Sequence, residues 1–169
     1  MSTTTNLGIT KLEVGQAQKE ATINAALDAL DAQIGGAWTS WTPTWTNLSV
    51  GNGTVVAKYA KNGKLVHARV SLVFGSTTSV SGDIQFTLPV TAATDSTTLK
   101  LPFGPSRGWD ASATTVYTGA VAYVDTTHAG IRFALASGTY VTQAVASSTV
   151  PFTWTTSDEI SGQFIYEAA

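Results

Sequence analysis

The 169-residue chain contains no cysteine, which excludes disulfide bonds, thiolate metal sites and cysteine-based catalysis but leaves the cellular compartment open. Charge is also scarce. Only 12% of the residues are charged, about half the usual fraction for a soluble domain. The net charge is -2 and the basic residues are scattered along the chain, so no basic stripe is present. We therefore expect no nucleic-acid partner.

Long apolar runs are absent as well. No segment approaches the roughly 18 apolar residues of a membrane span, and no segment has the pattern of a secretory signal. We expect neither membrane insertion nor secretion by an N-terminal signal, and a chain working outside the cell would have to leave by another route, such as lysis. Threonine, serine and 15 glycines replace the missing charges, which suits a β-rich surface.

One stretch, Leu12 to Ile34, has the periodicity of an α-helix. Four of its apolar residues fall at spacings of four, three and four, as in the a/d seam of a coiled coil. This seam consists of Ile23, Leu27, Leu30 and Ile34. Gly35 and Gly36 follow where a helix C-cap is expected. The sequence therefore predicts one helix that ends at Ile34.

So narrow an apolar stripe is too small to stabilise the helix alone. The helix could dock on the β-domain of its own chain, or pair with copies of itself in a short parallel bundle. We favour the second interpretation and expect a homotrimer whose β-domains share the interface, because two heptads are too short to hold it alone. With the polar segment before the helix, we assign residues 1–36 to an N-terminal arm and an oligomerising helix.

Residues 37–47 are rich in tryptophan, with Trp38, Trp41 and Trp45 around Pro43. Proline and alternating threonines favour an extended segment. These indoles could cap the β-domain or plug its junction with the helix, or they could stack on sugars. Because tryptophan is enriched at interfaces, we assign all three to the oligomer interface as a neck between helix and domain.

Residues 48–169 have the sequence pattern of short strands separated by turns. Two alternating runs flank Asn62 and Gly63, a strong hairpin signal. About nine short strands with no helix between them predict an antiparallel β-sandwich of the jelly-roll kind. The segment Gly75 to Gly82 is expected to be a loop, and Leu101 to Thr115, with two prolines, a long irregular excursion.

Catalytic motifs are not evident. The two histidines, His67 and His128, have no metal-ligand spacing, and the carboxylates lie in or beside turns, where aspartate is common for backbone reasons. We predict no enzyme activity, no cofactor and no metal site. A weak calcium site at Asp158 and Glu159 stays an alternative, and so does a two-carboxylate glycosidase.

The predicted excursion offers a candidate glycan site without catalysis. Its residues are Phe103, Arg107, Trp109 and Asp110. An indole can stack on a sugar ring while charged groups hydrogen-bond its hydroxyls. The alternative is that Trp109 folds back to cover an edge of the sandwich.

Residues 7–31, LGITKLEVGQAQKEATINAALDALD, closely resemble the N-terminal segment of a family of bacteriophage and gene-transfer-agent tail-fibre or head-fibre proteins. The matching residues are Gly15, Gln16, Ala17, Gln18, Lys19, Glu20, Asn24, Ala26, Leu27, Leu30 and Asp31. The segment from Trp41 to Leu88-Pro89 is more loosely similar to phage tail-fibre and minor-tail β-domains. The resemblance implies attachment to a virion and no chemistry. The anchoring residues that it implies are Leu7, Ile9, Leu12, Gln16, Gln18 and Lys19.

The resemblance, with which the helical seam and the strand pattern agree, implies a structural virion protein, a fibre or spike on the head or tail of a tailed phage. It would contact capsid, neck or tail proteins, reach the outside by host lysis, and present a β-domain to host-surface polysaccharide. Alternatives are a stand-alone carbohydrate-binding module and a capsid decoration protein without a receptor.

Overall fold

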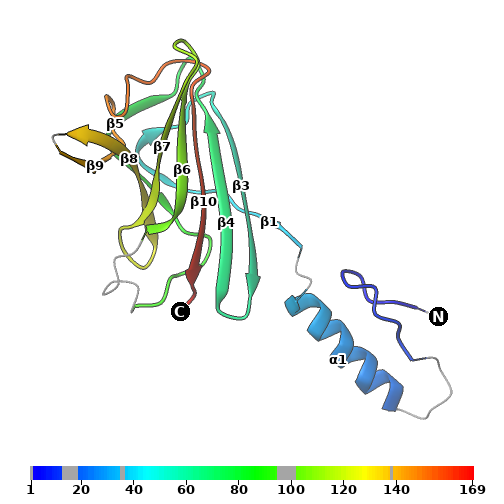
Figure 1. The fold of residues 1–169 in the computed structure, drawn as a ribbon. Helices are drawn as coiled ribbons and strands as arrows, with labels where there is room; N and C mark the ends of the chain where they lie inside the picture. Colours follow the sequence, from blue (N-terminus) through cyan, green and yellow to red (C-terminus); the bar gives the residue numbers. More distant parts are fainter. Residues whose placement is uncertain (1, 13–18, 35–36, 95–101, 138) are drawn as a thin grey trace.

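The structure is a computed structural model that describes residues 2–12, 19–34, 37–94, 102–137 and 139–169. One helix, α1 (Lys19–Ile34), precedes ten antiparallel strands. Figure 1 shows the helix and the N-terminal arm outside the sheet. A mainly β chain with one N-terminal helix is therefore confirmed. The helix does not extend back to Leu12, which lies in the arm, and residues 13–18 lie outside the described residues.

The strands are β1 (Thr39–Ser40), β2 (Trp45–Ser49), β3 (Thr54–Asn62), β4 (Leu65–Val73), β5 (Ser79–Thr87), β6 (Pro102–Asp110), β7 (Thr115–Tyr123), β8 (His128–Ser137), β9 (Tyr140–Val145) and β10 (Glu159–Glu167). They form one sheet in the order β1-β3-β4-β10-β6-β7-β8-β5-β2, and β9 pairs with β8 beside this path. The two separate sheets of a sandwich are not shown. The hairpin at Asn62 and Gly63 is confirmed, since it joins β3 to β4.

The sheet curls strongly, as a half-barrel, around one apolar core (Figure 1). The rings of Phe86 in β5 and Phe164 in β10 lie 5.7 Å apart, although three strands separate β5 from β10 in the sheet. One face of the sheet lines this core, because β4 buries every second side chain from Val66 to Leu72 and exposes or half-exposes those between them. Residues of distant strands therefore share one core.

The tryptophan-rich segment connects the two ends of the strand order. β1 pairs with β3 at one end and β2 pairs with β5 at the other. Between them, the backbone N–H of Trp41 donates to the Ala57 carbonyl. The ring centres of Trp41 and Trp45 lie 6.3 and 5.4 Å from the ring centre of Phe86. Both indoles thus pack on the core of their own chain.

The expectation of an irregular excursion at Leu101 to Thr115 is wrong for the described residues. β6 is a central strand between β10 and β7. Proline cannot donate to a β-ladder, but the pairing of β6 with β10 runs only from Ser106 to Trp109, so Pro105 lies just beyond it. The expected loop at Gly75 to Gly82 is also too long, because β5 already begins at Ser79.

Candidate functional site

The outer face of β3, β4, β10 and β6 carries an ordered set of polar side chains. Strand register places Val56, Ser71, Ser161 and Arg107 side by side across these four strands. The two central positions are serines, whereas the flanking positions carry larger side chains. Because neighbouring strands are about 4.8 Å apart, this row forms a shallow trough with hydroxyl groups on its floor.

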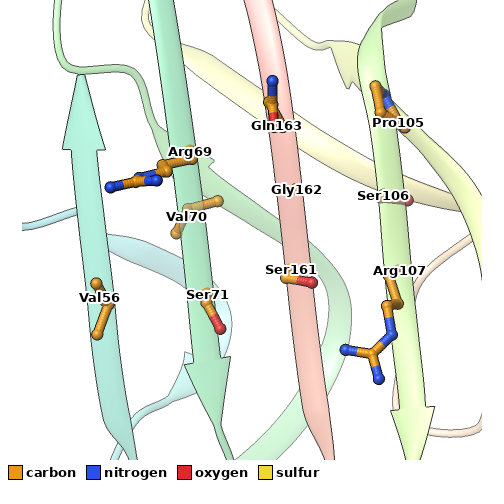
Figure 2. A pocket seen from close by; sticks show the side chains of 10 residues that line it. All are labelled: Val56, Arg69, Val70, Ser71, Pro105, Ser106, Arg107, Ser161, Gly162 and Gln163. Atoms are coloured by element: carbon orange, nitrogen blue, oxygen red, sulfur yellow. The ribbon is translucent and has the colours of Figure 1, made fainter. Parts of the chain in front are cut away.

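A groove of about 350 Å³ coincides with this trough. Its outward-facing lining includes Arg69 and Gln163 from the next row of the same face, where Gln163 pairs with Arg69 and Arg69 with Lys58. Figure 2 shows Arg107 on β6 beside the serines, and Arg69 on β4, one row away, with its guanidinium extending toward β3. Both arginines line the groove, from two different strands.

Arg107 is held at one end of the groove by a carboxylate and an indole. Its Nη1 donates to Glu159 Oε2 at 3.3 Å, and its Cζ lies 5.4 Å from the centre of the Trp109 ring. The Ser71 hydroxyl donates to the other oxygen of Glu159 at 3.3 Å. Because a guanidinium has five N–H donors, this ion pair leaves Arg107 able to bind a ligand as well.

Arg69 is held at the other end by a second indole. Its Cζ lies 4.6 Å from the centre of the Trp38 ring, and that ring meets His67 edge-on at 5.1 Å. Nε2 of His67 lies 2.9 Å from Nε2 of Gln163. Within the described part of the chain, Arg69 has no carboxylate partner. Two arginine–tryptophan pairs therefore flank the serine floor.

The structure brings together two of the four predicted glycan residues. Arg107 and Trp109 lie beside the groove, whereas Asp110 begins the turn to β7 and accepts hydrogen bonds from Ser112 and Ala113. Phe103 faces inward and stacks on Phe164 and Tyr166 in the core. A bulge between Pro102 and Gly104 accounts for its direction, because it shifts the alternation of β6.

Sequence reasoning assigned no ligand-binding role to four further polar residues that line the groove, which are Arg69, Ser71, Ser161 and Gln163, and it did not place Glu159 beside them. Alternation in β4 and β10 could have assigned most of them to an outer face. It could not have shown that β10 lies between β4 and β6.

A second groove, of about 760 Å³, lies over β5, β7, β8 and β9 and includes Arg132, Asp83 and Asp125 in its lining. Its charges are of both signs, and its aromatic lining residue is Tyr123. The first groove differs in the two arginine–tryptophan pairs that lie beside it.

The N-terminal arm folds into a small hairpin, with Thr3 bridging to Thr10, and packs along α1. Asp31 is buried under it, with 3% of its surface exposed. The Thr4 hydroxyl and the Leu7 N–H donate to its Oδ1 at 2.8 and 2.6 Å, and the Asn6 N–H donates to its Oδ2 at 2.9 Å. One helix carboxylate therefore organises the arm.

Burial tends to raise the pKa of Asp31, but the hydrogen bonds from Asn6, Leu7 and Thr4 lower it below its ordinary value. Two further contacts extend the attachment toward the start of the helix. Lys11 forms an ion pair of 2.6 Å with Asp28, and Asn24 exchanges two hydrogen bonds with the backbone of Leu12. The arm is thus bound by a polar stripe on α1.

The predicted oligomerisation residues lie in two places. On α1, Ile23, Leu30 and Ile34 are 45%, 48% and 54% exposed, and Leu27 is half-buried. Trp38 is exposed beside the groove, unlike Trp41 and Trp45 in the core. Nothing in the single chain tests their part in an oligomer.

Among the predicted anchoring residues, Leu7 and Leu12 are exposed and Ile9 is half-buried in the arm. Lys19 is the first residue of α1. Gln16 and Gln18 lie outside the described residues.

Asp158 has a structural role. It is fully buried and accepts hydrogen bonds from the Ala111 N–H at 2.9 Å and the Thr155 hydroxyl at 3.1 Å. In the described residues, no three histidine, aspartate or glutamate side chains group in a way that could hold a metal ion. No helix of the described part is long and apolar enough to cross a membrane.

Comparison with known protein families, curated proteins and solved structures finds no match to this chain.

Proposed function

We propose that this chain is a structural virion protein of a tailed phage or a phage-like particle, a homotrimeric head or tail fibre or spike. Its N-terminal module, which consists of the arm and α1, attaches it to capsid, neck or tail proteins, and its β-domain adheres to glycans of the host surface. It assembles in the host cytoplasm and leaves by lysis. The resemblance of residues 7–31 to phage fibre proteins supports the attachment.

The observation that carries the proposal is the division of α1 into two stripes. Asn24, Asp28 and Asp31 bind the arm. Each of them follows a residue of the apolar seam by one position, which is a rotation of about 100° around a helix. Three seams packed against one another would leave the three arms on the outside of the bundle, where they are able to contact the particle.

The β-domain fits this arrangement. In the proposal, α1 forms a trimeric coiled coil, and the two halves of the curled sheet pack over one core as in a jelly-roll sandwich. Contact of Phe86 with Phe164 across the interior supports the packing of the two halves. Seam residues that are nearly half exposed support the coiled coil, because apolar side chains on a helix need a partner.

The first test is the solution mass by light scattering, for the full chain and for residues 37–169. We expect a trimer and a monomer, respectively. Leu27→Asp places an unpaired charge in the seam and should also give monomers, whereas Ala29→Asp, on the far side of the helix, should leave the trimer intact. A full-length monomer, or a trimer that tolerates Leu27→Asp, would contradict the seam.

The second test addresses attachment. Deletion of residues 2–11 should abolish incorporation into particles while the trimer and the sheet persist. Incorporation at the normal level would argue against an anchoring arm.

A stand-alone carbohydrate-binding module is the second candidate, favoured by the groove between two arginine–tryptophan pairs. Such a module has no use for the arm, so the 2–11 deletion should leave its sugar binding intact. A capsid decoration protein without a receptor would show incorporation and no sugar binding.

A further inference from the structure

We infer that the groove on the outer face of β3, β4, β10 and β6 binds an acidic glycan, a chain of sugars that bear carboxylates. The inference rests on the proposed function, since it names the class of glycan that the β-domain would take. It is carried by the charges and hydroxyls that strand register places together (Figure 2) and by the two indoles that lie beside the arginines.

The charge of this face differs from that of the whole chain. The net charge of the chain is -2, yet Lys58, Arg69 and Arg107 lie on one face, on β3, β4 and β6. Glu159 neutralises Arg107 in part, whereas Arg69 has no carboxylate partner among the residues described. A guanidinium without a partner at a groove favours an anionic ligand, and its planar pair of donors matches a carboxylate.

The rest of the lining favours a sugar over a simple anion. The hydroxyl of Ser161 and the amide of Gln163 can hydrogen-bond sugar hydroxyls from the floor. The Trp38 ring, 40% exposed, stands beside Arg69 and offers an apolar surface for a sugar ring. A small inorganic anion would use the guanidinium and leave these groups without a role.

The two arginines also indicate a ligand of more than one sugar. Arg69 in β4 and Arg107 in β6 are separated by β10, so about 10 Å of sheet lies between their strands. A ligand that contacts both must cross the serine floor, and an oligosaccharide has the length and the hydroxyl groups to do so.

The test measures binding to the full-length protein by titration calorimetry, with oligogalacturonate and oligosialate as acidic probes. Maltohexaose is the neutral sugar and polyglutamate the acidic non-sugar. We expect at least one acidic sugar to bind, with at least tenfold weaker binding of maltohexaose and of polyglutamate. Arg69→Gln should weaken binding of the acidic sugar at least tenfold. Arg132→Gln, the same change on the outer face of β8 and in the other groove, should not alter it.

Glu159→Gln gives a test of opposite sign. It removes the negative charge beside Arg107 and replaces the carboxylate with an amide of nearly the same size, so binding of the acidic sugar should strengthen by roughly two- to fivefold. Binding of a neutral sugar in the same groove would not change.

Several outcomes would overturn the inference. They are no binding of either acidic sugar, equal binding of maltohexaose or polyglutamate, or a loss with Arg132→Gln in place of Arg69→Gln. Light scattering of the same samples separates the two proposals. A trimer that binds no acidic sugar refutes this inference alone, whereas a monomer refutes the trimeric fibre, whichever sugar it binds.

Discussion

The two parts of this molecule are held together by different kinds of interaction. The sheet encloses an apolar core in which Phe86, Phe133 and Phe164 are at most 1% exposed. The described residues of the arm and α1 enclose no such core. Their contacts are polar, centred on Asp31, and their large apolar residues are nearly half exposed. A core stabilises a domain on its own, whereas a helix with an exposed seam needs a partner.

This difference supports the different tasks that we propose for the two parts. The sheet can carry a binding surface as a rigid single chain, because its outer face is positioned by the core beneath it. The N-terminal module is suited to assembly, since the residues that would complete its packing are absent from the described chain. The two parts should therefore respond to different substitutions.

The largest effect is expected in the core of the sheet. Phe164→Ala would leave a cavity where its ring contacts those of Phe86, Phe103 and Tyr166, and should cost about 3–5 kcal/mol of unfolding free energy. Ile165→Ala, at the next position and 48% exposed, should cost less than about 1 kcal/mol. Denaturant unfolding of residues 37–169 measures both. Equal losses would contradict a core confined to one face.

A buried carboxylate in the sheet should give the next largest effect. Asp158 uses both oxygens, Oδ1 for Ala111 and Oδ2 for Thr155, so Asp158→Asn presents a donor to a donor and should cost about 1–3 kcal/mol. Asp110 accepts from Ser112 and Ala113 with Oδ1 alone, so Asp110→Asn can keep both bonds and should change stability little. Denaturant midpoints compare the two, and a larger loss for Asp110→Asn would refute this account.

Much of the fold could be predicted from local pattern. Alternation identified β4, the Asn62–Gly63 pair identified the β3–β4 hairpin, and helical spacing identified α1. β6 was missed because its prolines argue against a central strand, and only the neighbouring pairing shows that Pro105 lies beyond the ladder with β10.

Non-local contacts could not be predicted in the same way. Ser71 and Ser161 are far apart in sequence and adjacent in the groove, because β10 inserts between β4 and β6. In the sequence pattern, Asp31 is one more polar residue of a helix. Its burial depends on an arm that folds back over it. Local sequence carries no signal for either arrangement.

In the N-terminal module the expected effects are smaller and local. Asp31→Asn can keep only one of the two accepting oxygens, so the arm should open more often. Hydrogen exchange of the Asn6 and Leu7 amides should quicken by roughly tenfold, as expected for the loss of one hydrogen bond to a charged group, while unfolding of the sheet is unchanged. Asp28→Asn removes only a partly exposed ion pair with Lys11 and should have less effect. Destabilisation of the sheet by Asp31→Asn would break the distinction between the two parts.

The smallest of these effects is expected from mild acid, which acts on the carboxylate of Asp31. Because the folded pKa of Asp31 is lowered, its contribution to arm binding is complete above the unfolded value, about pH 4. That contribution decreases as the pH falls through the folded pKa. Exchange of the Asn6 and Leu7 amides, corrected for the intrinsic effect of pH, should therefore show more frequent opening between pH 4 and pH 2, and Asp31→Asn should abolish this trend.

The pKa of Asp110 is lowered too, chiefly by the Ala113 N–H, so the β6–β7 turn should loosen in the same range. The sheet is held by an apolar core among the residues described, so the arm should open before the sheet unfolds. Simultaneous loss of both would show that the arm and the sheet are one cooperative unit.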